Sequence, residues 1–155
     1  MPANSLDSKL LLQVIDSGYV RKAWHGPNLK QSLRGVAARD AAWRPAPGRH
    51  NIWEIAVHAA YWKYVVRRKL TGEPRGSFAL KGSNWFKRPL ASTEKAWQED
   101  RKLLEGEHLK LREAVAALGP AQARQIPWSI LYGVAFHDVY HAGQIRLLRR
   151  LRTRA

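Results

Sequence analysis

The sequence predicts an all-α protein, a four-helix bundle with a long crossover loop between the second and third main helices. Apolar residues recur at the three- and four-residue spacing of an amphipathic helix in four long segments. Residue types that cap or stop helices bound these segments. The sequence contains no run of alternating apolar and polar residues that would indicate a sheet, and no internal repeat or low-complexity tract. Four helices with one long connection therefore remain.

Length and composition are those of one globular domain. The chain has 155 residues, of which 45% are hydrophobic and 25% charged, and it contains seven tryptophans. A chain of this size can bury an apolar core, and its composition differs from that of disordered segments. We expect a single helical bundle domain over residues 1–155.

The first helix is expected to start at Ser5, a residue type that favours the N-cap position, and to be stopped by Gly26 and Pro27. Its apolar residues at core spacing are Leu6, Leu10, Leu11, Val14 and Ile15. The next segment, residues 28–42, favours a weakly amphipathic helix. The prolines and the glycine of WRPAPGRHN then predict a turn.

The clearest helix begins at Asn51, because Glu54 three residues later completes a capping pattern, and it ends at Thr71 and Gly72. Its residues in core register are Ile52, Ile55, Ala59, Trp62, Val66 and Leu70. Residues 73–92, EPRGSFALKGSNWFKRPLAS, contain glycines and two prolines without a sustained period. They predict a long connection of the kind that often carries function.

Two further helices complete the predicted bundle. One spans residues 93–118, with Gly119 and Pro120 as its stop signal, and the other runs from Trp128 to about Leu151. The expected buried stripe of the former is Trp97, Leu104, Leu111, Val115 and Leu118. The expected buried stripe of the latter is Ile130, Val134, Ile145 and Leu148.

Two histidines fall on the buried stripe of the last helix. His137 and His141 are four residues apart, so their Cβ atoms would lie about 6 Å apart on one helical face. Because buried imidazoles need partners, one metal ion could bind both. The spacing therefore makes this pair a candidate for metal binding.

His58 has the same kind of position on the Asn51 helix, between Ile55 and Trp62 on the apolar stripe. Three imidazoles from two helices could then hold one divalent ion. The alternative is that they are ordinary core histidines with backbone or water partners. Periodicity leaves both interpretations open, although three histidines on facing stripes favour the metal site.

Other residues give weaker signals. His108 falls on the stripe of the third helix, where it would be a core histidine or a fourth ligand. His25 is expected at a helix end, near the terminal carbonyls, and His50 in a solvated turn. The stretch HDVYH resembles the zincin motif, but Asp138 stands where that chemistry needs a glutamate base, which disfavours a protease.

Four stretches carry a resemblance to a known family. They are WHGP, WRPAPGRHNIWEIAVHAAYW, LKGSNWF and FHDVYHAGQI, of which the last is the most specific. In these stretches, over nearly the whole chain, the sequence resembles the DinB-like, or YfiT-like, superfamily of metal-binding four-helix proteins. This superfamily is unrelated to the DNA polymerase that shares the DinB name.

The resemblance implies that His58, His137 and His141 are the metal triad, with nickel or zinc as the ion, and that the protein is a homodimer. Some relatives are transferases or isomerases that use low-molecular-weight thiols, and others are metal-dependent hydrolases. The family therefore leaves the small-molecule substrate open. Gln144, in the family's GQI pattern, would either orient a ligand or be an ordinary helical amide.

Three histidines leave a coordination position open and leave the ion its full positive charge, which suits catalysis better than a structural role. The chain has no cysteine, so any thiolate must come from a cosubstrate, whereas hydrolysis would use water. Trp85 and Phe86 are expected either to fold over the site or simply to anchor the loop. The sequence offers no unambiguous general base, so a metal-binding module without turnover is an alternative.

The net charge supports a rival class of function. Lysine and arginine total 27 against 12 acidic residues, for a formal charge of +15, which attracts nucleic acid and other anions. The tryptophans, however, mostly fall on apolar stripes rather than beside the arginines of VRRKL and RLLRRLRTRA, which disfavours a nucleic-acid-binding module. With no apolar run of about 20 residues and no basic leader, we expect a cytoplasmic protein outside the membrane.

Overall fold

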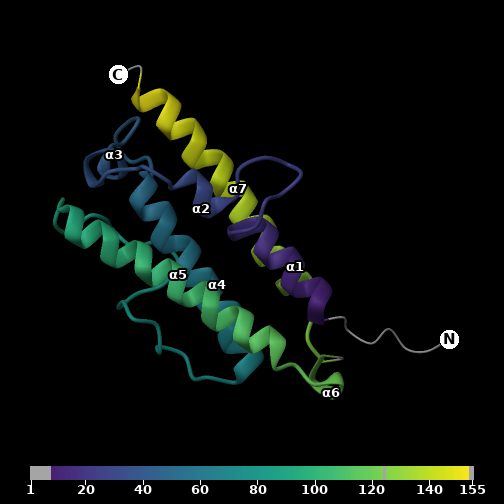
Figure 1. Cartoon of the computed structure of the whole chain (residues 1–155). Helices are drawn as coiled ribbons and strands as arrows, with labels where there is room; N and C mark the ends of the chain where they lie inside the picture. The colour runs from purple at the N-terminus through teal and green to yellow at the C-terminus, as the bar shows by residue number, and fades with distance from the viewer. Residues whose placement is uncertain (1–7, 124, 154–155) are drawn as a thin grey trace.

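The computed structural model describes residues 8–123 and 125–153, and every named element in this part of the chain is a helix. The long helices are α1 (Ser8–Tyr19), α4 (Ile52–Thr71), α5 (Glu94–Ala116) and α7 (Trp128–Arg152). The short ones are α2 (Leu29–Ser32), α3 (Ala38–Ala42) and α6 (Pro120–Ala123). The long helices pack as a bundle, which confirms the predicted all-α class (Figure 1). None of the described helices combines the length and apolar character needed to pass through a bilayer.

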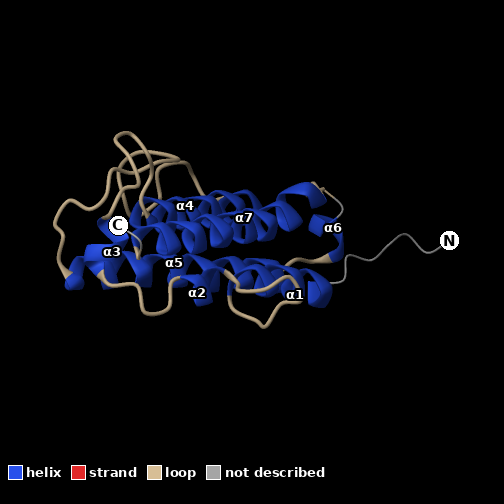
Figure 2. Cartoon of the chain, turned by 90° about the horizontal axis from the view of Figure 1, so that it is seen from above, coloured by secondary structure: helices blue, strands red, loops and turns tan. Residues whose placement is uncertain are grey.

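The long helices run in two directions. In Figure 1 the colour advances along α4 and α5 from the same end of the bundle, so these two helices are parallel, whereas α1 and α7 run the opposite way. The teal segment between α4 and α5 therefore returns along the length of the bundle. In Figure 2 several loops rise above α4 at one end of the molecule.

Several of the buried polar side chains lie where two apolar clusters of the core meet. Along each long helix they fall at or next to the boundary between the members of the two clusters. They are Asp16 on α1, Lys63 and Arg67 on α4, Glu107 and His108 on α5, and Asp138 and His141 on α7. The middle of the bundle is therefore polar, and its charges need partners.

The structure changes the predicted limits of the first helix. Ser5 and Leu6 lie outside the described residues, and α1 ends at Tyr19, well before Gly26. The backbone N–H groups of Val20 and Arg21 both donate to the Asp16 carbonyl, which ends the helix. Of the expected core residues, Leu11 and Ile15 are buried, Val14 is half-buried and Leu10 is 52% exposed.

The prediction of one helix over residues 28–42 is wrong. The segment forms α2, which begins with a capping box between Asn28 and Gln31, and then α3. Gly35 separates the two with φ +72°, a left-handed conformation that other residues rarely adopt. The result is a short corner rather than a bundle helix.

The predicted limits of α4 are confirmed. The Asn51 side chain accepts a hydrogen bond from the Glu54 N–H, and Gly72 ends the helix in a left-handed conformation with φ +75°. Thr93 caps α5 in the same way as Asn51 caps α4, so the irregular connection spans residues 73–92 as expected.

The expected core positions are mostly confirmed, with some corrections. Ile130 and Leu118 are only half-buried, and Trp62 is 37% exposed. Four of the seven tryptophans, Trp43, Trp53, Trp85 and Trp97, are buried or pack partly buried against the core, whereas Trp24, Trp62 and Trp128 are exposed. Trp128 begins an exposed row along α7 that continues with Tyr132, Phe136, Tyr140, Leu147 and Leu151.

Candidate metal centre

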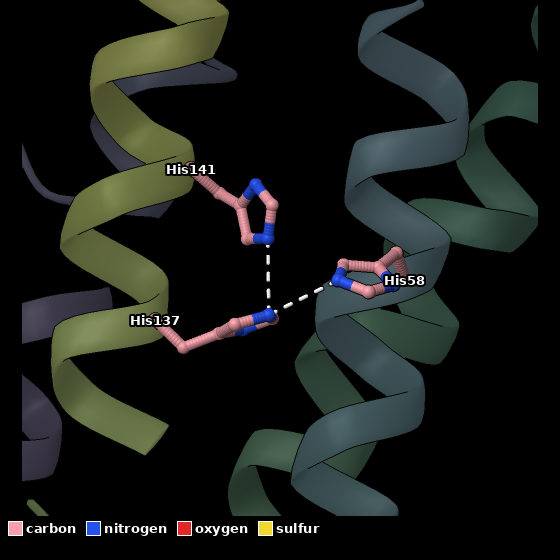
Figure 3. A group of neighbouring side chains, drawn as sticks. All are labelled: His58, His137 and His141. Carbon is pink, nitrogen blue, oxygen red and sulfur yellow. Dashed lines mark hydrogen bonds between the residues drawn. The ribbon is translucent and has the colours of Figure 1, made fainter. Parts of the chain in front are cut away.

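The three predicted histidines converge between α4 and α7. Nε2 of His137 lies 3.0 Å from Nε2 of His58 and 3.0 Å from Nε2 of His141. Figure 3 shows the three rings pointing toward one another, His58 from one helix and the other two from successive turns of the facing helix. One ligand atom from each residue lies within 4.8 Å of the others, a grouping that could hold a metal ion.

Hydrogen bonds on the far sides of two rings fix which nitrogen carries the hydrogen. The Nδ1–H of His58 donates to the backbone carbonyl of Asn84 over 2.8 Å, and the Nδ1–H of His141 donates to Oε1 of Gln144 over 2.7 Å. Carbonyl oxygens only accept, so the Nε2 atoms of both rings present lone pairs toward His137. Gln144 therefore orients a ring of the cluster.

This donor set fits a divalent ion. With lone pairs on His58 and His141, at most one hydrogen, on His137, is available for two short contacts between nitrogen atoms. Imidazole nitrogens bound to one ion at about 2.0–2.1 Å lie about 3 Å apart, which is the separation of the His137 Nε2 atom from the Nε2 atoms of His58 and His141. The cluster contains nitrogen donors alone, without a carboxylate among the described residues.

The electrostatics keep the three imidazoles neutral. Burial lowers the pKa of His58 below its ordinary value. Burial, together with repulsion from its neighbouring histidines and Lys63, lowers the pKa of His137 to about 3, and burial lowers that of His141 to about 4. Neutral rings can bind a metal at pH 7 without first losing a proton.

Asp138 does not face the cluster as a base. Its carboxylate pairs with the Lys63 ammonium group, and both side chains are 1% exposed. Burial raises the pKa of this carboxyl group, and the lysine opposes that effect. The stretch HDVYH therefore does not place a carboxylate at the histidine cluster, where the glutamate base of the zincin motif would be.

Trp85 covers one side of the site. Its ring stacks on His58 with centroids 3.8 Å apart and planes 6° from parallel, and its other face stacks on His50 at 3.6 Å and 5°. Phe86 instead lies in the core, against Tyr61 and other aromatic rings. Of the two expected arrangements, Trp85 therefore folds over the site, whereas Phe86 anchors the loop.

Two residues of the site escaped the sequence analysis. Asn84, with φ 62°, bonds to His58 through its carbonyl and accepts from the Trp62 indole N–H through its side chain. His50 is not simply solvated, because its Nδ1 lies 3.0 Å from Glu54 while its ring supports Trp85. The four-residue spacing of His50 and Glu54 is the one local signal that could have indicated this contact.

The remaining histidines lie elsewhere. His108 is a core histidine whose Nε2 contacts Asp16 at 3.1 Å, and it is not a member of the cluster. His25 is exposed in the loop after α1 and lines a shallow cavity against α7, rather than capping a helix end. Neither supplies a fourth ligand.

Comparison with known proteins gives one finding. A family model described as the DinB superfamily matches residues 23–145, which include all three histidines of the cluster. No curated protein and no solved structure matches the chain.

Proposed function

Because the chain belongs to the DinB superfamily, we propose that His58, His137 and His141 bind one divalent metal ion and that the protein is a metal-dependent enzyme acting on a small molecule. The observation that carries the proposal is the convergence of three Nε2 atoms, two of them held as acceptors by Asn84 and Gln144. Isolated core histidines would not need to face one another in this way.

The ligand chemistry favours zinc or nickel. Neutral imidazoles suit these ions, whereas magnesium and calcium prefer oxygen donors, which the described cluster lacks. Three protein ligands leave room for a further group, as in catalytic rather than structural sites. When bound, such an ion supplies Lewis acidity that lowers the pKa of a water or a thiol.

Two reaction classes fit this chemistry, a thiol-dependent transfer and a hydrolysis. The chain has no cysteine, so the thiol in a transfer must be a low-molecular-weight cosubstrate. The protein's own groups hold His58 between Asn84 and Trp85 and keep His141 on Gln144. Their role is to fix the rings, since no carboxylate of the described residues joins the cluster as a base.

Elemental analysis of protein purified without a histidine tag tests the metal site. We expect about one zinc or nickel ion per chain, and its loss in His58→Ala, because two imidazoles bind far more weakly than three. His25→Ala is the matched control, since that histidine is exposed and is not a member of the cluster. Equal metal content in His58→Ala and the parent protein would contradict the site.

Turnover is tested separately from metal binding. Metal-free and reloaded protein are compared in the transfer of a thiol to 1-chloro-2,4-dinitrobenzene and in the hydrolysis of a nitrophenyl ester. We expect activity in one assay that is restored by the metal and absent in His58→Ala. A bound ion without activity in either assay would favour the alternative of a non-catalytic metal-binding module.

A further inference from the structure

A cleft of about 960 Å³ lies between the second half of α4 and the segment 75–83 of the long connection. Its volume is at the upper end of the range for clefts that bind small molecules. It is separate from the polar centre of the bundle, and the proposed chemistry has not used it.

Cations line this cleft without acidic partners. Arg68, Lys69, Arg75 and Lys81 all contribute to the lining, and no aspartate or glutamate does. Within the described part of the chain, none of these four side chains has an ion pair or hydrogen bond. By contrast, Arg67, which precedes Arg68 in the chain, forms ion pairs with Glu73 and Glu107. Unpaired cations that share one cleft favour an anionic group there.

Apolar aromatic rings line the same cleft as the cations. Tyr61, Trp62 and Phe78 line the cleft, and the rings of Tyr61 and Phe78 pack edge to face at 5.4 Å. Aromatic walls favour a flat apolar body. The combination suits an organic anion rather than an inorganic ion alone.

The cleft and the histidine cluster share a wall. The Trp62 ring lies 6.4 Å from the His58 ring and 6.2 Å from the His137 ring, and the same ring lines the cleft. Ser83 also lines the cleft, and the next residue, Asn84, accepts the hydrogen bond from His58. A molecule in the cleft can therefore contact Trp62, whose ring lies next to two histidines of the candidate metal centre.

We infer that this cleft binds the substrate, a small organic anion with a flat apolar body whose carboxylate, sulfonate or phosphate lies among the four cations. The inference rests on the proposed function, in which the histidine cluster acts on a small molecule. The cations select the charge of the substrate, and the aromatic wall positions its body next to the cluster.

Calorimetric titration of the full chain with naphthalene-2-sulfonate tests the inference, with the uncharged naphthalene-2-sulfonamide for comparison. We expect the sulfonate to bind at least 10-fold more tightly. In Arg75→Gln/Lys81→Gln its affinity should fall at least 5-fold, and both replaced side chains are exposed, so the fold should be retained. Lys22→Gln/Lys95→Gln removes the same charge at exposed positions outside the cleft and should leave the affinity unchanged.

Equal losses in the two double variants would overturn the inference, because the sulfonate would then respond only to the net charge of +15. Equal affinity for the sulfonate and the sulfonamide would also overturn it. The titrations use metal-free protein, and the metal content of each variant is measured in parallel. If the sulfonate does not bind in the cleft but the metal content is normal, only this inference is overturned. If the sulfonate binds as expected but no metal is found, only the proposed function is overturned.

Discussion

At the scale of single residues, the site depends on atoms that never contact the metal position. The carbonyl of Asn84 and the amide of Gln144 determine which nitrogen of His58 and His141 carries the hydrogen. The stack of His50, Trp85 and His58 limits rotation of the last ring. The three ligand atoms are therefore already oriented before an ion binds.

Replacement of Gln144 tests this orientation. In Gln144→Ala the His141 Nδ1–H loses its acceptor, and we expect metal affinity to fall about 10- to 100-fold, as for other partners of metal-binding histidines. Gln98→Ala is the control, since among the described residues that amide bonds only to Glu94 on α5. The measurement is a competition titration with a zinc chelator, and unchanged affinity in Gln144→Ala would show that the ring needs no such partner.

At the scale of elements, close contact between α1 and α7 depends on Gly18. A Cβ atom at this position would lie 2.7 Å from the Ala135 carbonyl oxygen and 3.2 Å from its Cα. These are backbone atoms of a helix, so they cannot yield without a shift of α7. The glycine lets the two helices approach, and α7 carries two of the three histidines.

Gly18→Ala should therefore destabilise the protein by about 1–3 kcal/mol, the usual range for overpacking, despite the better helix propensity of alanine. Gly106→Ala on α5 is the matched control, because its Cβ would meet nothing within 4 Å. That control should gain about 0.5–1 kcal/mol. Urea unfolding of both variants gives the comparison, and equal free energies of unfolding would rule out the clash.

At the scale of the whole molecule, the polar layer makes stability depend on pH. Burial, aided by Lys63 and Arg112, lowers the pKa of His108 to about 2, and the pKa values of His137 and His141 are about 3 and 4. An unfolded chain has imidazole pKa values of about 6.5, so it takes up protons first as the pH falls. The three histidines therefore do not change the free energy of unfolding with pH above about pH 6.5. Below that pH, the free energy of unfolding falls as the pH is lowered.

The metal-free protein should accordingly lose stability between pH 6.5 and 4.5, by up to about 1.4 kcal/mol per pH unit for each of these histidines. Urea unfolding at a series of pH values measures the slope. His108→Gln removes one of the three groups and should make the slope shallower. A slope that is unchanged in this variant would mean that His108 is protonated in the folded state.

The whole molecule also presents surfaces whose partners stay predictions. The exposed aromatic row on α7 is a place where the expected homodimer could form, and the net charge keeps the nucleic-acid alternative testable through its dependence on salt. The row begins at Trp128, whose exposure the spacing of apolar residues along the helix did not reveal.

The sequence by itself determined the helical class, the limits of α4 and the three histidines, because helical spacing and capping are local properties of the chain. His137 and His141 must share a face wherever their helix lies. Only the tertiary structure decided which atoms meet: Asn84 contacts His58 across 26 residues, and Lys63 pairs with Asp138 across 75. No periodic pattern encodes such contacts, and the connection that supplies Asn84, Trp85 and half of the cleft has no period at all. The packing of the loop on α4 determines them, so the site's supporting residues emerged only from the fold.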